Sequence, residues 1–219
     1  MMYLKERQEI IDYGIKMLEM GLTKGTGGNL SVFVRDKGHM LISPSGIEYH
    51  KIKPEDIVVM DLDGNIISGD KKPSSEHEMH SIVYKTRDDI DAVIHTHTIH
   101  CAAVSCMNVD LPAVHYMIAV AGGKNVRCAK YATFGTPELA KNAIEAMKDR
   151  KAVLLANHGL LAGAKDLANA LNITDEIEFV AQLYLMTKAA GEPVILPDEE
   201  MDLMLGRFAS YGQIKSDKK

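Results

Sequence analysis

The chain has 219 residues, of which 46% are hydrophobic and 25% charged. This is the composition of a soluble globular domain, and no apolar run reaches the roughly 18 residues that a membrane span needs. A formal charge of −5, the lack of a long basic stretch, and 3 cysteines without CxxC spacing argue against nucleic acid as the main partner, a disulfide framework and a thiolate zinc site. Residues 1–10 carry early charges and no apolar core, so we expect a cytoplasmic protein with neither a secretory signal nor a membrane attachment.

The first half of the chain predicts a helix, two β-hairpins and the start of a second helix. Apolar residues recur at helical spacing over 3–20. Alternating apolar residues on both sides of a turn predict a hairpin over 30–42, and the pattern repeats over 57–68. Ser75 is followed three residues later by Glu78, which is the capping-box pattern of a helix N-terminus.

The second half of the chain predicts strands that alternate with helices. These elements are a strand over 91–97, a short helix over 99–107, a helix over 136–148, a strand over 151–159, and helices over 166–190 and 198–208. No internal repeat and no linker rich in Pro or Ser divides the chain. We therefore predict a single domain over 1–219 of the α/β class, a layered fold in which helices flank a mainly antiparallel central β-sheet.

The stretch VIHTHTIH places three histidines at the end of an apolar run. Side chains alternate faces along a strand, so His95 and His97 are expected to point to the same side, close enough to share one ion. A third ligand could come from His158, at the end of another apolar strand in LLANHGLL. Three neutral imidazoles with an open position are the ligand set of a catalytic zinc site. A hydrogen-bonded polar pair at a strand end would show the same spacing.

The histidines of SSEHEMHS resemble a metalloprotease motif but fail its spacing. His77 and His80 are three residues apart, whereas the two histidines of HExxH are four apart. We expect them at the surface or behind the ligands rather than on an ion. His100 lies beyond the predicted strand, and its expected role is packing or a supporting hydrogen bond.

Three loops of small residues are candidates for a phosphate site: GTGGN at 25–29, SPSG at 43–46 and PSSE at 73–76. Glycines let the backbone approach an anion, serine hydroxyls donate to it, and a helix that begins near Ser75 presents its positive dipole end. Each loop alone is more often an ordinary turn, and only the combination favours an anion site. Glu76 is then a candidate general base, or else a first-turn glutamate that stabilises the helix dipole.

Taken together, these segments resemble the class II aldolase and adducin family over nearly the whole chain. The resemblance rests on GTGGNLS, SPSGI, PSSE, VIHTHTIHCAAVS, VHYMIAVAGG, YATFGT, NHGLLA and AQLYLMT. It implies a Zn²⁺ ion held by His95, His97 and His158. Glu76 would be a fourth ligand that moves away to act as the base.

The resemblance also implies substrate contacts and an assembly. The phosphate would lie against six residues: Gly28, Asn29, Ser45, Gly46, Ser74 and Ser75. Phe134 would line the aldehyde side. Tyr116 and Tyr211 would be active-site tyrosines, one of which donates a proton to the aldehyde oxygen across a subunit boundary. Members of the family form homotetramers with sites between subunits, so we expect the same here.

The expected reaction is reversible retro-aldol cleavage of a ketose 1-phosphate, with L-fuculose 1-phosphate favoured, to dihydroxyacetone phosphate and L-lactaldehyde. The alternatives are aldolases of 5-deoxypentulose 1-phosphates or their methylthio analogues, a dehydratase of methylthioribulose phosphate, an L-ribulose-5-phosphate 4-epimerase, and a catalytically inactive tetrameric scaffold. The resemblance implies that such epimerases carry PSSD at the position where this chain has PSSE. Glu76 therefore favours the aldolase.

Overall fold

A computed structural model describes residues 1–208 of the chain. Within that range, eight strands form one sheet in the order β4-β3-β2-β1-β5-β8-β7-β6, and every neighbouring pair is antiparallel except β6 with β7. The strands are β1 (Asn29–Val34), β2 (His39–Ile42), β3 (Val58–Asp61), β4 (Ile66–Ser68), β5 (Ala92–Thr96), β6 (Cys128–Ala129), β7 (Ala152–Leu155) and β8 (Gly159–Ala164). The predicted α/β class with a mainly antiparallel sheet is confirmed.

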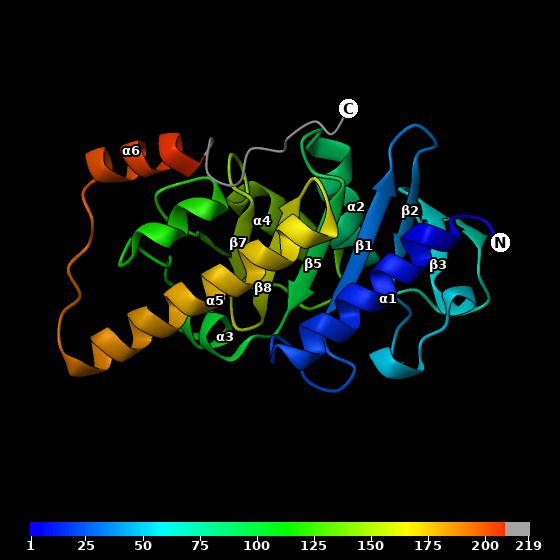
Figure 1. Ribbon diagram of the computed structural model, residues 1–219, viewed down its shortest axis with the longest axis horizontal. Coiled ribbons are helices and arrows are strands. Elements are labelled where there is room, and N and C mark those ends of the chain that lie inside the picture. Colours follow the sequence, from blue (N-terminus) through cyan, green and yellow to red (C-terminus); the bar gives the residue numbers. More distant parts are fainter. Residues whose placement is uncertain (209–219) are drawn as a thin grey trace, which may run out of the picture.

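Helices cover both faces of the sheet (Figure 1). One face carries α1 (Leu4–Glu19), α3 (Ile99–Cys106), α5 (Leu167–Ala190), α6 (Asp198–Phe208) and the 3₁₀ helices η1 (Tyr49–Lys51), η2 (Pro54–Asp56) and η3 (Tyr116–Ala121). The other face carries α2 (His77–Thr86) and α4 (Pro137–Ala146). Within the described range, none of these helices is both long enough and apolar enough to cross a membrane.

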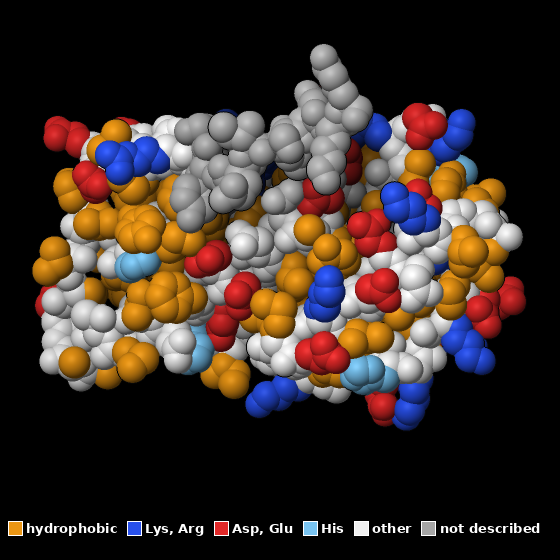
Figure 2. Space-filling view, in the orientation of Figure 1, with side chains coloured by type: hydrophobic (Ala, Val, Ile, Leu, Met, Phe, Trp, Pro, Cys, Tyr) orange, Lys and Arg blue, Asp and Glu red, His pale blue; other side chains and the backbone are white. Residues whose placement is uncertain are grey.

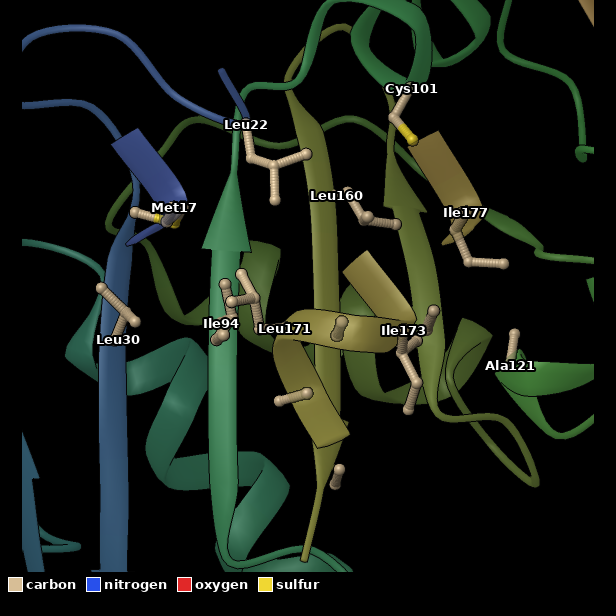
Figure 3. Close-up of a cluster of buried hydrophobic side chains, with 14 of the residues drawn as sticks. Met17, Leu22, Leu30, Ile94, Cys101, Ala121, Leu160, Leu171, Ile173 and Ile177 are labelled. Atoms are coloured by element: carbon tan, nitrogen blue, oxygen red, sulfur yellow. The ribbon is translucent and has the colours of Figure 1, made fainter. Parts of the chain in front are cut away.

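Alternation of side chains along the strands produces a hydrophobic core on each face of the sheet. The core under α1 and α5 includes buried residues of β1, β5, β8 and α5 (Figure 3): Leu30, Ile94, Leu160, Leu171 and Ile173. Burial of each such side chain contributes about 1.5–3 kcal/mol. Val93 belongs to the second core, with α2 and α4. His95 lies two residues further along β5 and therefore points to the face that α2 covers.

The predicted helices at 136–148 and 166–190 begin at their capping residues. The Thr136 hydroxyl accepts a hydrogen bond from the Leu139 N–H at 3.3 Å, and the Asp166 carboxylate accepts one from the Asn169 N–H at 2.8 Å. Such caps satisfy donors that the first turn of a helix leaves free. These starts were readable from sequence because all the atoms involved lie within one turn.

The capping box predicted at Ser75 and Glu78 is wrong. Helix α2 begins at His77, and its N-cap residue makes no side-chain cap hydrogen bond. The backbone N–H of Ser74 instead donates to the Ser43 carbonyl of the neighbouring loop, next to a β-bridge between Pro44 and Pro73. Long-range pairing therefore overrides the local capping pattern.

The segment after β7 forms a hairpin that the sequence pattern did not reveal. We predicted a single strand over 151–159, whereas β7 ends at Leu155 and the chain reverses into β8. The reversal passes through Asn157 in the left-handed conformation, with φ of 53°. Both strands are fully buried, so each lacks the alternation of apolar and polar residues that marks a half-exposed hairpin.

Candidate active site

Three segments of the chain bring four potential metal ligands together near the end of β5. His95 lies on β5, His97 follows the strand, His158 lies in the β7–β8 turn, and Glu76 precedes α2. One ligand atom from each residue can be chosen so that all four lie within 4.8 Å of one another. The predicted histidine set and the predicted carboxylate therefore share one place in the fold.

Strand pairing places these residues. His95 pairs with Asn29 of β1 on one side and with Leu161 of β8 on the other. The β7–β8 turn approaches β5 so closely that a Cβ atom at Gly159 would collide with the carbonyl oxygen of Thr96. Glycine at this position lets the turn carry the third histidine to the strand end.

The atoms that face one another fit a divalent metal ion. His95 Nδ1 lies 2.9 Å from the Leu160 carbonyl oxygen, which can only accept, so in the neutral ring Nε2 carries the lone pair. His95 Nε2 lies 3.0 Å from His97 Nε2 and 3.3 Å from Glu76 Oε2, and His158 Nε2 lies 3.5 Å from Glu76 Oε1. Ligands of a tetrahedral zinc ion are about 3.4 Å apart. Glu76 Oε1 is buried without a hydrogen-bond partner, as expected for an atom that a cation would satisfy.

The environment keeps the imidazoles of His95 and His158 neutral. Desolvation lowers the pKa of His95 well below 6.5, and the neighbouring His158 and His97 lower it further. Desolvation also lowers the pKa of His158, although Glu76 opposes the shift. Neutral imidazole is the form that binds a metal, so the pocket favours binding at neutral pH.

We expect the metal-free protein to lose stability as the pH falls below about 6.5, the ordinary pKa of histidine. His80 is also fully buried, and desolvation, with a smaller effect of His95, lowers its pKa to about 3. A depressed folded-state pKa means that the unfolded chain binds more protons in acid, so stability present above about 6.5 is lost as the pH falls. For His80 alone the slope is about 1.4 kcal/mol per pH unit.

Urea unfolding with a chelator present, at about pH 7 and about pH 5, measures this loss. His80→Gln should flatten the dependence, whereas His50→Gln, at an exposed histidine, should leave it unchanged. Equal slopes in the wild type and the His80 variant would show that His80 is not held neutral.

A pocket of about 390 Å³ opens over the ligand cluster. Its lining includes the predicted phosphate and aldehyde contacts Gly28, Asn29, Ser45, Gly46, Ser74, Ser75 and Phe134, as well as Glu76, His97 and His158. No Lys or Arg of the described residues lines it. An anion in this pocket would therefore be held by neutral donors and by the positive end of the α2 dipole.

Backbone contacts explain why the three small-residue loops converge. The Ser45 N–H donates to the Lys72 carbonyl at 2.9 Å and the Ser74 N–H donates to the Ser43 carbonyl at 3.1 Å, so the second and third loops run side by side. The first loop meets β5 at Gly28, whose φ is 70° and where a Cβ would lie 2.6 Å from the His95 carbonyl oxygen. Only glycine fits there without displacing the strand.

Some of the residues singled out from sequence lie elsewhere. Tyr116, on η3, is 46% exposed and its ring faces that of Phe208; it does not line the pocket of its own chain. Tyr211 lies outside the described residues. His100 Nδ1 lies 2.7 Å from a carboxylate oxygen of Glu178, which matches the supporting role expected for it.

The lining residues Thr26, Gly27 and Pro44 belong to the predicted small-residue loops, whereas the sequence reasoning missed Tyr131, Ala132 and Asn157. Tyr131 and Ala132 belong to the YATFGT segment and Asn157 directly precedes a predicted ligand, so proximity to known motifs was the available signal.

Comparisons with known proteins show what the chain is similar to. Residues 8–185 match the family model described as "Class II Aldolase and Adducin N-terminal domain". The chain is 54% identical to a 5-deoxy-D-ribulose 1-phosphate aldolase of Bacillus thuringiensis serovar kurstaki, over 97% of this chain and 100% of that protein. It is 47% identical to the L-fuculose phosphate aldolase of Escherichia coli (strain K12), over 95% of this chain and 96% of that protein. A solved structure named L-fuculose 1-phosphate aldolase superposes with a TM-score of 0.92 at 59% identity, covering 94% of this chain and 96% of that one.

Proposed function

The chain belongs to the class II aldolase and adducin family, and from this membership we propose that it is a metal-dependent sugar-phosphate aldolase. The proposed reaction is reversible cleavage of a ketose 1-phosphate to dihydroxyacetone phosphate and a small aldehyde. One observation carries the proposal. Three histidines and a buried carboxylate converge at the pocket that all three small-residue loops line.

The cofactor proposed is Zn²⁺, because three imidazoles and one carboxylate are a nitrogen and oxygen ligand set that suits this ion. His95, His97, His158 and Glu76 would hold it. When bound, such an ion supplies Lewis-acid polarisation of the substrate's carbonyl group.

The protein's own residues account for binding and for one proton transfer. In the cleavage direction the electron pair of the C3–C4 bond stays on C3, the C4 hydroxyl loses its proton as the aldehyde forms, and C3 takes up a proton. We assign the proton at C3 to Glu76, whose carboxylate is buried beside the pocket. The loops at 25–29, 43–46 and 73–76 would hold the phosphate and so fix the distance from C1 to the carboxylate.

We propose that Tyr116 or Tyr211 from a neighbouring subunit takes up the proton that the C4 hydroxyl loses.

Hydrophobic side chains gather over α5 and α6 on the face shown in Figure 2. Exposed hydrophobic residues of α5, α6 and the segment between them include Phe179, Met186, Val194 and Leu203, of which Met186 is 63% and Val194 85% exposed. Apolar exposure of this extent favours an interface, which supports the homotetramer expected from the family resemblance.

For the substrate we favour a 5-deoxypentulose 1-phosphate over the L-fuculose 1-phosphate expected from sequence. The relative that is 54% identical is named for the deoxypentulose substrate, and the relatives named for L-fuculose phosphate reach 47%. Both substrates share the dihydroxyacetone phosphate half and differ by one hydroxymethylene unit in the aldehyde. The solved structure named for L-fuculose 1-phosphate keeps that sugar as the second candidate.

We expect both substrates to be cleaved, with kcat/KM higher for 5-deoxyribulose 1-phosphate by no more than about 10²-fold. Tyr131, Ala132 and Phe134 also line the pocket, and a mainly apolar surface rejects an added hydroxyl only weakly. A coupled assay for triose phosphate measures both values. L-ribulose 5-phosphate is the control: its interconversion without triose release would favour the epimerase, and no turnover of any of the three would overturn the proposed function.

A further inference from the structure

A buried chain of hydrogen bonds runs from α2 through β1 to Glu76. Its central member is His80, which is fully buried in the core between α2 and the sheet. His80 Nδ1 lies 2.6 Å from Ser31 Oγ, and His80 Nε2 lies 2.5 Å from Asn29 Oδ1. Asn29 Nδ2 donates to Glu76 Oε2 at 3.0 Å, and the Tyr84 hydroxyl lies 2.6 Å from Ser31 Oγ at the far end. The histidine of the failed HExxH motif is thus joined to the proposed base through one side chain.

The donors and acceptors of this chain have one consistent arrangement. A carboxylate only accepts, so the amide NH₂ of Asn29 must face Glu76 and the amide oxygen must face His80. His80 must then donate from Nε2 and accept at Nδ1 from the Ser31 hydroxyl. Burial, which lowers the pKa of His80 to about 3, agrees with this neutral ring.

This arrangement decides which oxygen of Glu76 is available. Oε2 is engaged by Asn29, whereas Oε1 has no hydrogen-bond partner and lies 3.5 Å from His158 Nε2. Without a donor at the position of His80 Nε2, the Asn29 amide loses its partner and can rotate. An amide oxygen turned toward Glu76 would repel the carboxylate and displace it from the ligand cluster.

We propose that His80 is a positioning residue that sets the orientation of the Asn29 amide and thereby aims the Glu76 carboxylate at the three histidines. The inference rests on the proposed function for the role of Glu76. The competing explanation is that His80 is a hydrogen-bonded core residue that contributes only to stability.

Two amide substitutions separate these explanations. The amide nitrogen of glutamine can reach the place of His80 Nε2, whereas asparagine, one methylene shorter, reaches only the place of Nδ1. Tyr84→Phe is the matched control, because it removes a buried hydroxyl from the same network and leaves the link from His80 to Asn29 intact. The readouts are Zn²⁺ affinity by competition with a chromophoric chelator, the absorption spectrum of the Co²⁺-loaded protein, kcat and KM separately, and the melting temperature.

We expect His80→Asn to lower Zn²⁺ affinity and kcat by about 10- to 100-fold, the range for loss of a residue that supports a metal ligand, with a smaller change in KM. His80→Gln should stay within about threefold of the wild type, and Tyr84→Phe should lower only the melting temperature. If His80→Asn does not fold, His80→Met, which lacks both ring nitrogens but suits a buried helix, must show the same losses.

Wild-type affinity and kcat in a folded His80→Asn or His80→Met variant would overturn the inference. Equal losses in Tyr84→Phe would also overturn it, since the network would then act through stability alone. A wild-type protein that neither binds Zn²⁺ nor releases triose phosphate would overturn the proposed function, which the same measurements report separately.

Discussion

Replacing Glu76 with glutamine is expected to lower kcat by about 10²- to 10⁴-fold, the range that a general base supplies. The substitution keeps the size of the side chain and an oxygen that can accept from Asn29, but it removes the charge and the ability to take a proton. Affinity for the phosphate group should change little, because the glycine and serine residues of the three loops are untouched. Kinetics of triose phosphate release, with inhibition by inorganic phosphate as the binding measure, test the two expectations separately.

Glu78→Gln is the control for the loss of a carboxylate near the start of α2, because Glu78 does not line the pocket. It should keep kcat within about twofold, well below the effect expected of a base. The metal content of both variants must be measured, since Glu76 is also a proposed ligand. Full activity in Glu76→Gln at normal metal content would remove Glu76 from the role of base.

Replacing His158 with alanine is expected to weaken Zn²⁺ binding by roughly 10²-fold or more. Four-ligand zinc sites bind with about 10–16 kcal/mol, so one ligand accounts for about 3 kcal/mol, which corresponds to roughly two orders of magnitude. His158 is the proposed ligand from the β7–β8 turn, and its loss leaves His95, His97 and the Glu76 carboxylate in place. Chelator competition measures the affinity, and added Zn²⁺ should restore part of the activity.

His77→Ala is the matched control, because His77 belongs to the HExxH-like stretch but not to the cluster of ligand atoms. Its Zn²⁺ affinity should equal that of the wild type. If His77→Ala lost the metal and His158→Ala kept it, the ion would belong to the N-terminal turn of α2, and the proposed site would be wrong.

Much of the fold was readable from sequence where the deciding interactions are local. The caps at Thr136 and Asp166 each satisfy a backbone N–H three residues away, and both helices begin where predicted. Side chains alternate between the two faces of a strand, which likewise assigned His95 to one face of β5. The start of α2 was misplaced because a backbone bond from Ser74 to Ser43, 31 residues earlier in the chain, competes with the local capping pattern.

The candidate site divides in the same way. The sequence by itself determined which chemical groups are present: imidazoles spaced to share an ion, glycine and serine loops suited to an anion, and a carboxylate after one of them. The family resemblance predicted that Glu76 joins His158, but only the tertiary structure decided how these two side chains meet and that His80 reaches Glu76 through Asn29. The physical reason is that ligand chemistry is a property of each side chain, whereas the meeting of distant residues depends on strand register and on the reversal between β7 and β8, which involve contacts across the whole sheet.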